Sequence, residues 1–386
     1  MIIPEQVFTA KKPFFIFSEQ EIRSSVTTVR NFWQKWSRPG FEIFFSVKVN
    51  PNPHILKIIS QFVEGFDVSS IAEARLVRKL GIDCSRITWS GPAKTRQGLT
   101  EALGWGLRCF HLDSFDEWQL FRSFGPEVIA ANRFSLRLSS NKIHNQKLGW
   151  SALELKKLSQ SDSRKWPAVH SYLGRETFGA ASIQDFSDHL QGRIAEGLFV
   201  ENPEIFLGAG LPSQKIIESH LLELAPKALP QKILNLEAGR ALIQNAGCYG
   251  TQILSNKVSN GKRFIIIDGG LQHLGSHLLS PSYKSEAVEI RFFRAGQELL
   301  DRSDLIAVHG SLSLWHDALI SDIPAPQDLR RGDWFVANHV GAYGFTAASS
   351  QFLGPSQISE WLLLEENSRL QKITPENLVP YCGAGL

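Results

Sequence analysis

Lys48 is the residue of this sequence best placed for covalent chemistry. It follows the stretch Phe41–Val47, which is rich in β-branched and aromatic residues, and Pro51 and Pro53 end that stretch. The pattern predicts a buried strand that closes into a turn, with Lys48 at its carboxyl end. Burial there would lower the pKa of the amine and leave it free to attack a carbonyl carbon. The alternative is a lysine whose ammonium group reaches solvent at the end of a strand.

A glycine-containing turn could hold an anion. Gly208-Ala209-Gly210 follows the apolar residues Ile205–Leu207, which reads as a strand followed by a turn. Glycine lets the backbone approach an anion closely, and successive N–H groups can form an anion-binding concavity. By itself such a sequence is usually only a turn.

Strand and helix signals alternate around Lys48. Strand-like stretches at 41–49, 65–68, 86–89, 109–112, 134–138 and 168–172 are separated by helical patterns at 54–62, 71–80, 97–103 and 114–124. Repeated βα units of this length imply a parallel sheet, and their number suits a closed (β/α)8 barrel. An open doubly wound sheet fits the pattern as well.

The pattern of the sequence changes after about residue 234. Short strand-like stretches at 248–255, 264–268, 288–291, 305–309 and 334–338 are separated by turns rich in Gly, Pro, Ser and Asn. This pattern predicts an all-β domain. We therefore predict a barrel over residues 29–234 and a β domain over residues 235–386.

Composition limits the class of protein and its partners. The 386 residues suffice for two domains, and 43% hydrophobic with 20% charged residues is typical of a soluble globular protein. A net charge of +3 without long runs of like charge favours neither nucleic acid nor a membrane as partner. We find no signal-peptide pattern and no apolar stretch of transmembrane length. Four scattered cysteines without metal-ligand spacing predict reduced thiols in a cytoplasmic protein and no metal site.

Three motifs together resemble one enzyme family. FFSVKVNPNPHIL at 44–56, GFDVSSIAEARL at 65–76 and ITWSGPAKT at 87–95 are similar to the motif series of the fold-type III pyridoxal phosphate (PLP) decarboxylases, the group of diaminopimelate and ornithine decarboxylases. The resemblance extends almost to the C-terminus. It implies a PLP-binding barrel with a C-terminal β domain that also takes in residues 1–28. It also implies that Lys48 carries PLP as a Schiff base.

The resemblance implies further contacts with the cofactor. Glu237 would bond the pyridine nitrogen, and a carboxylate there keeps the ring protonated and able to accept electrons. Asp67 and Arg137 would lie near the cofactor, although a helix cap and a salt-bridge partner are their structural alternatives. The phosphate group would be bound by Gly208, Ala209 in place of a glycine, Gly210, Gly239, Arg240 and Tyr343.

Two positions depart from the family pattern beside the cofactor. Tyr172 stands where the family has a histidine that stacks on the PLP ring, and a tyrosine can still stack. Arg175 replaces a serine that meets the phosphate group, and a cation suits the same contact.

The stretch 308–317 departs further. It resembles a family segment that the partner subunit of a homodimer delivers into the active site. Ser313 replaces the cysteine that donates a proton, and Leu314 replaces an acidic contact for the distal amine of the substrate. Trp315 and Asp317 are candidate substrate contacts, with packing at the interface as the alternative for Trp315. If the segment is helical, His316 lies about one turn from Ser313 and could supply the proton.

We therefore predict a PLP-dependent decarboxylase that acts as a homodimer on an amino acid or amino-acid conjugate, as in siderophore or other secondary metabolism. Without an acidic contact at Leu314, ornithine, lysine and diaminopimelate are disfavoured as substrates. One alternative is a racemase of the same fold, with Lys48 and Tyr343 as the two bases. The other is a catalytically silent homologue that acts as a binding protein.

Overall fold

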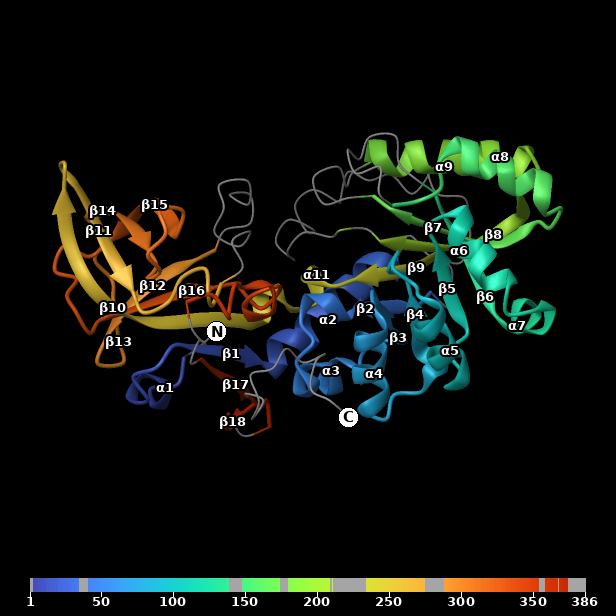
Figure 1. Ribbon diagram of the computed structural model, residues 1–386. Helices are drawn as coiled ribbons and strands as arrows, with labels where there is room; N and C mark the ends of the chain where they lie inside the picture. The colour runs from blue at the N-terminus through green and yellow to red at the C-terminus, as the bar shows by residue number, and fades with distance from the viewer. Residues whose placement is uncertain are drawn as a thin grey trace. The chain divides into compact units, whose positions relative to one another are not determined.

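The computed structural model describes residues 3–34, 41–138, 148–173, 180–208, 210, 234–274, 288–353, 358–366 and 368–373 (Figure 1). The described residues fall into two compact units. Residues 3–25 and 243–373 form one unit, and residues 26–242 form the other. No helix within these ranges has the length and apolarity needed to cross a bilayer.

The unit formed by residues 26–242 is a closed barrel of eight parallel strands. The strands are β2 Ile43–Ser46, β3 Gly65–Val68, β4 Ile87–Trp89, β5 Cys109–Leu112, β6 Arg133–Leu138, β7 Trp166–Tyr172, β8 Phe199–Gly208 and β9 Leu234–Ala238. The last strand pairs with the first, with Ile43 opposite Leu236, so the open sheet is excluded and the predicted (β/α)8 barrel is confirmed. The boundary that we placed after residue 234 cuts β9, so it is corrected to a position beyond this strand.

Helices accompany the strands on the outside of the barrel (Figure 1). Several begin at a residue whose side chain accepts a hydrogen bond from a backbone N–H in the first turn, as with Ser70, Thr95, Ser114 and Ser151. These caps explain why the helices start where they do. The helices are α2 Glu19–Gln34, α3 Pro53–Ile59, α4 Ile71–Lys79, α5 Arg96–Gly104, α6 Phe115–Arg122, α7 Pro126–Ala131, α8 Ala152–Ser161 and α9 Ala180–Ala195, and the short α11 Arg240–Ile243 follows β9.

The interior of the barrel is apolar toward one end. Phe44, Cys109, Ala168 and Phe206 form a buried cluster there. The carboxyl ends of the eight strands lie at the other end, where barrels of this kind place their active sites. Lys48 follows β2 directly, so it lies at this end.

The unit formed by residues 3–25 and 243–373 is built on a mixed β-sheet. Its strands are β1 Phe14–Ser18, β10 Gly247–Ser259, β11 Lys262–Ile267, β12 Ile290–Arg294, β13 Gln297–Leu299, β14 Asp304–His309, β15 Ala318–Ala325, β16 Trp334–Asn338, β17 Ser359–Leu363 and β18 Leu370–Lys372. Strand β1 pairs antiparallel with β10 and parallel with β17, so the start of the chain belongs to this sheet.

Aromatic packing holds the start of the chain against this sheet. Phe8, which lies on the short helix α1 Gln6–Thr9, contacts Phe14 and Trp334 with ring centroids 5.9 Å and 5.2 Å away. These rings belong to a buried cluster with Cys248 and Val336. Burial of such large apolar surfaces is the main force that stabilises a domain.

Candidate active site

Lys48 occupies a single 3-10 turn, Val47–Val49, immediately after β2. Its two neighbours are buried, but its own side chain is exposed at the carboxyl end of the barrel. This exposure matches the alternative of a lysine whose ammonium group reaches solvent at the end of a strand. Burial raises the pKa of two nearby carboxyls, those of Asp67 and Glu73, and the ammonium group of Lys48 opposes this rise.

Asp67 lies on β3 and is buried, and its Oδ1 atom makes no hydrogen bond. Burial and the neighbouring charge of Glu237 raise the pKa of Asp67 to about 8, against the opposing effect of Lys48. The side chain is therefore mostly protonated at neutral pH and reaches half protonation near pH 8. The helix-cap alternative for Asp67 is not what the structure shows, because Ser70 caps the helix that follows.

Glu237, on β9, is buried between two imidazole rings. Its Oε2 atom lies 2.8 Å from Nε2 of His170 on β7, in a hydrogen bond. Its Oε1 atom lies 2.9 Å from Nε2 of His111 on β5, but the geometry is not aligned for a hydrogen bond, so Oε1 retains an unused acceptor site. A carboxylate thus stands in the interior of the barrel with one oxygen still able to accept a hydrogen bond.

Arg137 is buried and acts through His170. It is the register partner of His170 across β6 and β7, and its Nε atom donates to His170 Nδ1 over 2.9 Å. Its Nη1 atom donates to both oxygens of Asp113, and Nη2 donates to the backbone carbonyl of Ser90. These contacts match the alternative in which Arg137 is a salt-bridge partner. Its guanidinium group hydrogen-bonds to His170, Asp113 and the backbone.

Both histidines are neutral at ordinary pH. Burial lowers the pKa of His170 to about 3, although the charge of Glu237 opposes this, and burial likewise lowers the pKa of His111. Burial alone would raise the pKa of Glu237, but the two rings hold it well below its usual value. The Nε2–H group of His170 donates a hydrogen bond to Oε2, and the Nε2 atom of His111 stands 2.9 Å from Oε1.

His111, His170 and Glu237 also lie close enough together to be considered as ligands of a metal ion. Two contacts favour hydrogen bonding instead. The Nε2 atom of His170 bonds directly to Glu237, and its Nδ1 atom accepts from the cationic Arg137. His170 and Glu237 already bond to each other, and the cationic guanidinium group of Arg137 lies beside them. Such a cluster is a poor binding site for a metal cation.

Glycines make room beside these side chains. A Cβ atom on Gly239 would lie 2.3 Å from Cγ2 of Val49, the residue after Lys48, and one on Gly208 would lie 3.0 Å from Cδ2 of Tyr172. Gly210 has a φ of +57°, which favours glycine. Tyr172, at the end of β7, is 40% exposed, so part of its ring faces the open end of the barrel.

Residues 23–160 match the family model of the pyridoxal-dependent decarboxylases, pyridoxal binding domain. The chain is 24% identical to L-glutamyl-[BtrI acyl-carrier protein] decarboxylase of Niallia circulans, over 89% of this chain and 86% of that protein. It is 23% identical to diaminopimelate decarboxylase of Aquifex aeolicus, over 92% and 87%. The chain belongs to the fold-type III PLP-dependent decarboxylase family.

A solved structure of this decarboxylase family has the same fold. Diaminopimelate decarboxylase of Helicobacter pylori, complexed with L-lysine, matches with a TM-score of 0.75 and 22% identity, over 96% of this chain and 95% of that one. Members of the family are carboxy-lyases that use PLP, so PLP is the cofactor of this chain and the predicted family and cofactor are confirmed.

The residues at the carboxyl end of the decarboxylase barrel fit PLP. Glu237 Oε1 and Asp67 Oδ1 are buried acceptors without an aligned hydrogen-bond partner, and the cofactor has ring and substituent groups that can donate to such atoms. Lys48 places an accessible amine at the same end of the strands. Gly208 and Gly239 have no side chain, which lets Tyr172 and Val49 pack closely against the backbone at this end of the barrel.

Asp67 makes the stability of the cofactor-free protein depend on pH. Its pKa in the folded protein, about 8, is above the ordinary 3.8, so the folded state binds the proton more tightly. The contribution of Asp67 to the free energy of unfolding therefore falls as pH rises from about 4 to about 8. We expect Asp67→Asn to remove this fall, so that the difference from wild type in the free energy of unfolding grows with pH across this window.

Chemical denaturation of the cofactor-free protein at several pH values measures this effect. Asp116→Asn, which removes an exposed carboxyl from α6, is the matched control and should show no such trend. A difference between Asp67→Asn and wild type that stays constant from pH 4 to pH 8 contradicts the raised pKa.

The predicted substrate-contact segment is a loop. Residues 310–317 connect β14 to β15 through bends and turns, so the helical arrangement considered for Ser313 and His316 is wrong. The reason is Asp317, whose two carboxylate oxygens accept the backbone N–H groups of Leu271 and Leu312, each at 2.9 Å. Asp317 is buried, and these two hydrogen bonds hold the loop.

The tip of this loop faces solvent. Ser313 and His316 are exposed, Leu314 is half-buried, and Trp315 is 90% exposed. The rings of Trp315 and His316 pack edge to face, with centroids 5.4 Å apart. An indole that is almost fully exposed in a single chain is the kind of group that a partner or a substrate covers.

For two of the remaining predicted site residues, Arg240 and Tyr343, the structure gives the position in the chain or the backbone conformation. Arg240 begins α11 next to Gly239. Tyr343 is half-buried in the loop after β16 and has a φ of +57°, which is rare for a residue with a side chain. Arg175 and Ala209 lie outside the described residues, so their predicted contacts with the phosphate group stay predictions.

Several site residues were missed in the sequence. His111, His170 and Asp113 meet around Glu237 and Arg137, although they come from different strands of the decarboxylase barrel. A polar residue inside or directly after an apolar parallel strand is the signal that could have found them. Lys94 and Glu117 form a further buried pair, in which Lys94 also donates to the backbone carbonyls of Gly91 and His111.

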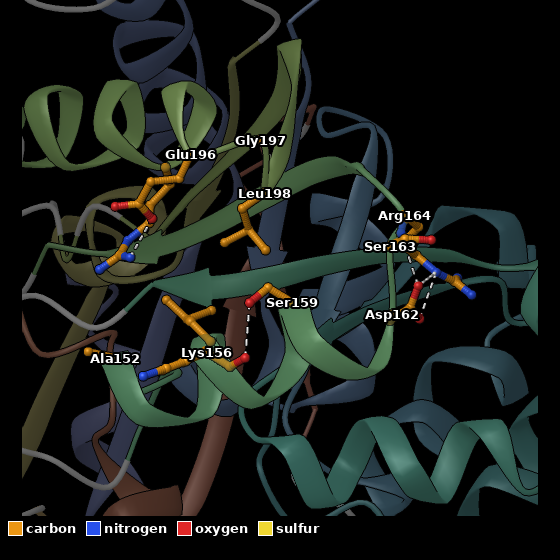
Figure 2. A pocket seen from close by; sticks show the side chains of 11 residues that line it. Ala152, Lys156, Ser159, Asp162, Ser163, Arg164, Glu196, Gly197 and Leu198 are labelled. Carbon is orange, nitrogen blue, oxygen red and sulfur yellow. Dashed lines mark hydrogen bonds and ion pairs between the residues drawn. The ribbon is translucent and has the colours of Figure 1, made fainter.

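A groove of about 480 Å³ lies between α8 and α9, on the outside of the barrel (Figure 2). Four of its charged side chains form two ion pairs, Arg164 with Asp162 at 3.0 Å and Arg193 with Glu196 at 2.7 Å, and Lys156 also lines the groove. Part of its lining directly precedes β7 and β8, at the end of these strands opposite to Tyr172 and Gly208. This groove is therefore separate from the site around Glu237.

Proposed function

We propose that this protein decarboxylates an amino acid or amino-acid conjugate, with PLP held covalently by the amine of Lys48. The observation that carries the proposal is the pairing of an accessible lysine at the mouth of the barrel with a carboxylate, Glu237, held ionised in the interior. PLP, when bound, supplies a ring that takes up the electrons left behind as the carboxylate departs as CO2.

The other proposed site residues would bind the ring and the phosphate group of PLP. Glu237 would accept a hydrogen bond from the ring nitrogen through Oε1. Tyr172 would stack against the ring, in place of the histidine of the family. Gly208, Ala209, Gly210, Gly239, Arg240, Arg175 and Tyr343 would bind the phosphate group, and Asp67 would lie near Lys48.

The proposed substrate lacks a distal ammonium group. Leu314 stands where the family has an acidic residue, and the exposed tip of its loop carries an indole and an imidazole instead. The relative from Niallia circulans acts on a glutamyl group attached to an acyl-carrier protein. This favours an amino acid joined to a larger group, with Trp315 as a contact for the distal part, in siderophore or other secondary metabolism.

His316 is the proposed proton source. An unactivated hydroxyl such as that of Ser313 is a poor acid, whereas an imidazole commonly donates protons near neutral pH. We expect His316→Gln to lower amine formation by about 10²- to 10⁴-fold, the usual contribution of a general acid. His309→Gln, which removes a histidine from the adjacent strand β14, should have little effect.

Product analysis separates the two donors. Amine, carbonyl product and oxygen uptake are measured for His316→Gln and Ser313→Cys. If His316→Gln leaves amine formation unchanged while Ser313→Cys raises it and suppresses a carbonyl product, the role of His316 is wrong.

The proposed enzyme is a homodimer in which the 310–317 loop serves the partner subunit's Lys48. We expect Lys48→Ala to be inactive, and also Asp317→Ala, because it removes both anchors of the loop. If subunits pair at random, mixing the two variants should restore about a quarter of wild-type activity, since half of the dimers have one intact site of two. Lack of recovery in verified heterodimers contradicts a shared site.

A CO2-release assay tests the proposed function. Purified protein is supplied with PLP and a panel of free amino acids, citrate–amino-acid conjugates and aminoacyl groups on a carrier protein. We expect CO2 from a conjugate and little from ornithine, lysine or diaminopimelate. Exchange of the α-hydrogen without CO2 would indicate a racemase, and PLP binding with neither reaction across the panel would favour a silent homologue.

A further inference from the structure

We infer that His170 and His111 are positioning residues that hold the carboxyl group of Glu237 in place and leave its Oε1 atom for the cofactor ring, with Arg137 fixing the proton of His170 on Nε2. The inference rests on the proposed binding of PLP at this site. The side chains of His170, His111 and Arg137 come from β7, β5 and β6, respectively, and all three are buried.

The contact between Arg137 and His170 decides which ring nitrogen carries the proton. A guanidinium group can only donate hydrogen bonds, so the nitrogen that it contacts must present a lone pair. Arg137 Nε contacts His170 Nδ1 at 2.9 Å. The proton of the neutral ring is therefore on Nε2, which lies 2.8 Å from Glu237 Oε2 and donates to it.

Arg137 is itself held in place. Asp113 accepts from its Nη1 atom at 2.9 Å and 3.1 Å, and the same carboxylate accepts from the backbone N–H of Gly149. The carbonyl of Ser90 accepts from Nη2 at 3.1 Å. The guanidinium plane is thus fixed from two sides, which fixes the ring of His170 in turn.

His111 supports the other oxygen of Glu237. Its Nδ1 atom forms a short contact with the hydroxyl of Ser135, and its Nε2 atom stands 2.9 Å from Glu237 Oε1 without an aligned hydrogen bond. Its ring packs against His170 with centroids 4.6 Å apart. The Oε1 atom therefore has the His111 ring beside it and can still accept a hydrogen bond from the nitrogen of a bound cofactor ring.

Neutral donors suit this task better than a cation. Asp67, Arg137 and Lys94 are the other charged or titratable groups whose charges act on this cluster. A lysine or arginine in direct contact with Glu237 would compete with the protonated ring nitrogen for the carboxylate charge. The two buried imidazoles instead stabilise the anion without a net charge of their own, His170 through a hydrogen bond and His111 through a contact of 2.9 Å, and leave its full charge for the cofactor.

Cofactor affinity tests this role without relying on turnover. The full-length protein is stripped of PLP, and its dissociation constants are measured for PLP and for an analogue in which C–H replaces the ring nitrogen. We expect wild type to bind PLP at least roughly tenfold more tightly than the analogue, the scale of one hydrogen bond to a charged group. His170→Phe should bring the two constants together by weakening PLP alone.

Two further variants separate positioning from packing. His170→Gln keeps a donor for Glu237 and an acceptor for Arg137, so it should retain most of the preference for PLP. His273→Phe removes another buried histidine, one bonded to Tyr249 in the β unit, and should leave the preference unchanged. A preference that survives intact in His170→Phe overturns the inference, and if that protein still releases CO2 the proposed function stands.

The proton on His170 can be observed directly by nuclear magnetic resonance. In the cofactor-free protein we expect one histidine with a persistent Nε2–H signal from pH 5 to pH 9, lost in His170→Gln. Arg137→Met should shift this ring toward a mixture of the two neutral forms. A wild-type signal from Nδ1–H of His170 overturns the inference whatever the protein catalyses.

Discussion

Replacement of Lys48 by alanine is expected to lower CO2 release by roughly 10⁴-fold or more, the scale on which enzymes lose activity when a covalent nucleophile is removed. The physical reason is that no other described amine lies at the carboxyl end of β2. The substitution removes an exposed side chain from a short turn, so the free energy of unfolding should change by less than about 1 kcal/mol.

The matched control is Lys57→Ala. Lys57 is an exposed lysine on α3, the helix that follows Lys48, and it has no assigned role. We expect its CO2 release to equal that of wild type in steady-state kinetics. If Lys48→Ala retains more than about a hundredth of wild-type activity while folded, a covalent role for Lys48 is excluded.

Glu237→Gln should lower the turnover number by about 10²- to 10³-fold, as expected when a preorganised electrostatic partner of the reacting centre is lost. Glutamine has nearly the same shape, and its carbonyl oxygen can still accept from His170 Nε2. What it lacks is the negative charge that holds a proton on the ring nitrogen. The loss should therefore fall on the turnover number, with a smaller change in the concentration of PLP needed for half-saturation.

Glu204→Gln is the control for this substitution. Glu204 lies on β8 of the same barrel, where it contacts Arg133 and Asn235, the latter within 2.6 Å. It has no part in the proposed site, so its turnover number should match wild type. Equal activity of Glu237→Gln and wild type contradicts a requirement for the carboxylate charge.

Local signals were sufficient for much of the barrel. The strands at 65–68 and 109–112 have the predicted bounds, and α4 ends one residue before the prediction, because short apolar runs are flanked by capping and turn residues. Strand β8 is longer than the apolar residues 205–207. Its first half contains Pro203 and pairs irregularly with β7, so it reads as a turn in the sequence.

Other strands depend on partners that are distant in the chain. β17 is the parallel partner of β1, more than 300 residues earlier, and nothing in its own five residues indicates this. β15 contains Pro324 and pairs only with β14, which is the edge position where a proline is tolerated. Pairing with the neighbouring strands of the sheet determines the conformation of such segments, and the intrinsic preference of their own residues does not.

The same distinction applies to the site. Lys48, Asp67 and Glu237 could be predicted because each lies in a motif that resembles a family pattern. His170 lies in the motif that contains Tyr172, but the motif gives it no role, and His111 lies in no motif. The role of both histidines comes from meeting Glu237 across three strands. The conformation of the 310–317 loop was missed for a related reason, since Asp317 fixes it through the backbone of Leu271, which is 46 residues away.

Borohydride reduction of the PLP-loaded protein, followed by peptide mapping, tests the central claim most directly. Reduction makes the bond between the cofactor and a lysine permanent, so the labelled residue can be read by mass spectrometry. We predict a single phosphopyridoxyl group on the peptide that contains Lys48. A label on another lysine, such as the buried Lys94, or no label on protein saturated with PLP, would contradict the assignment of Lys48.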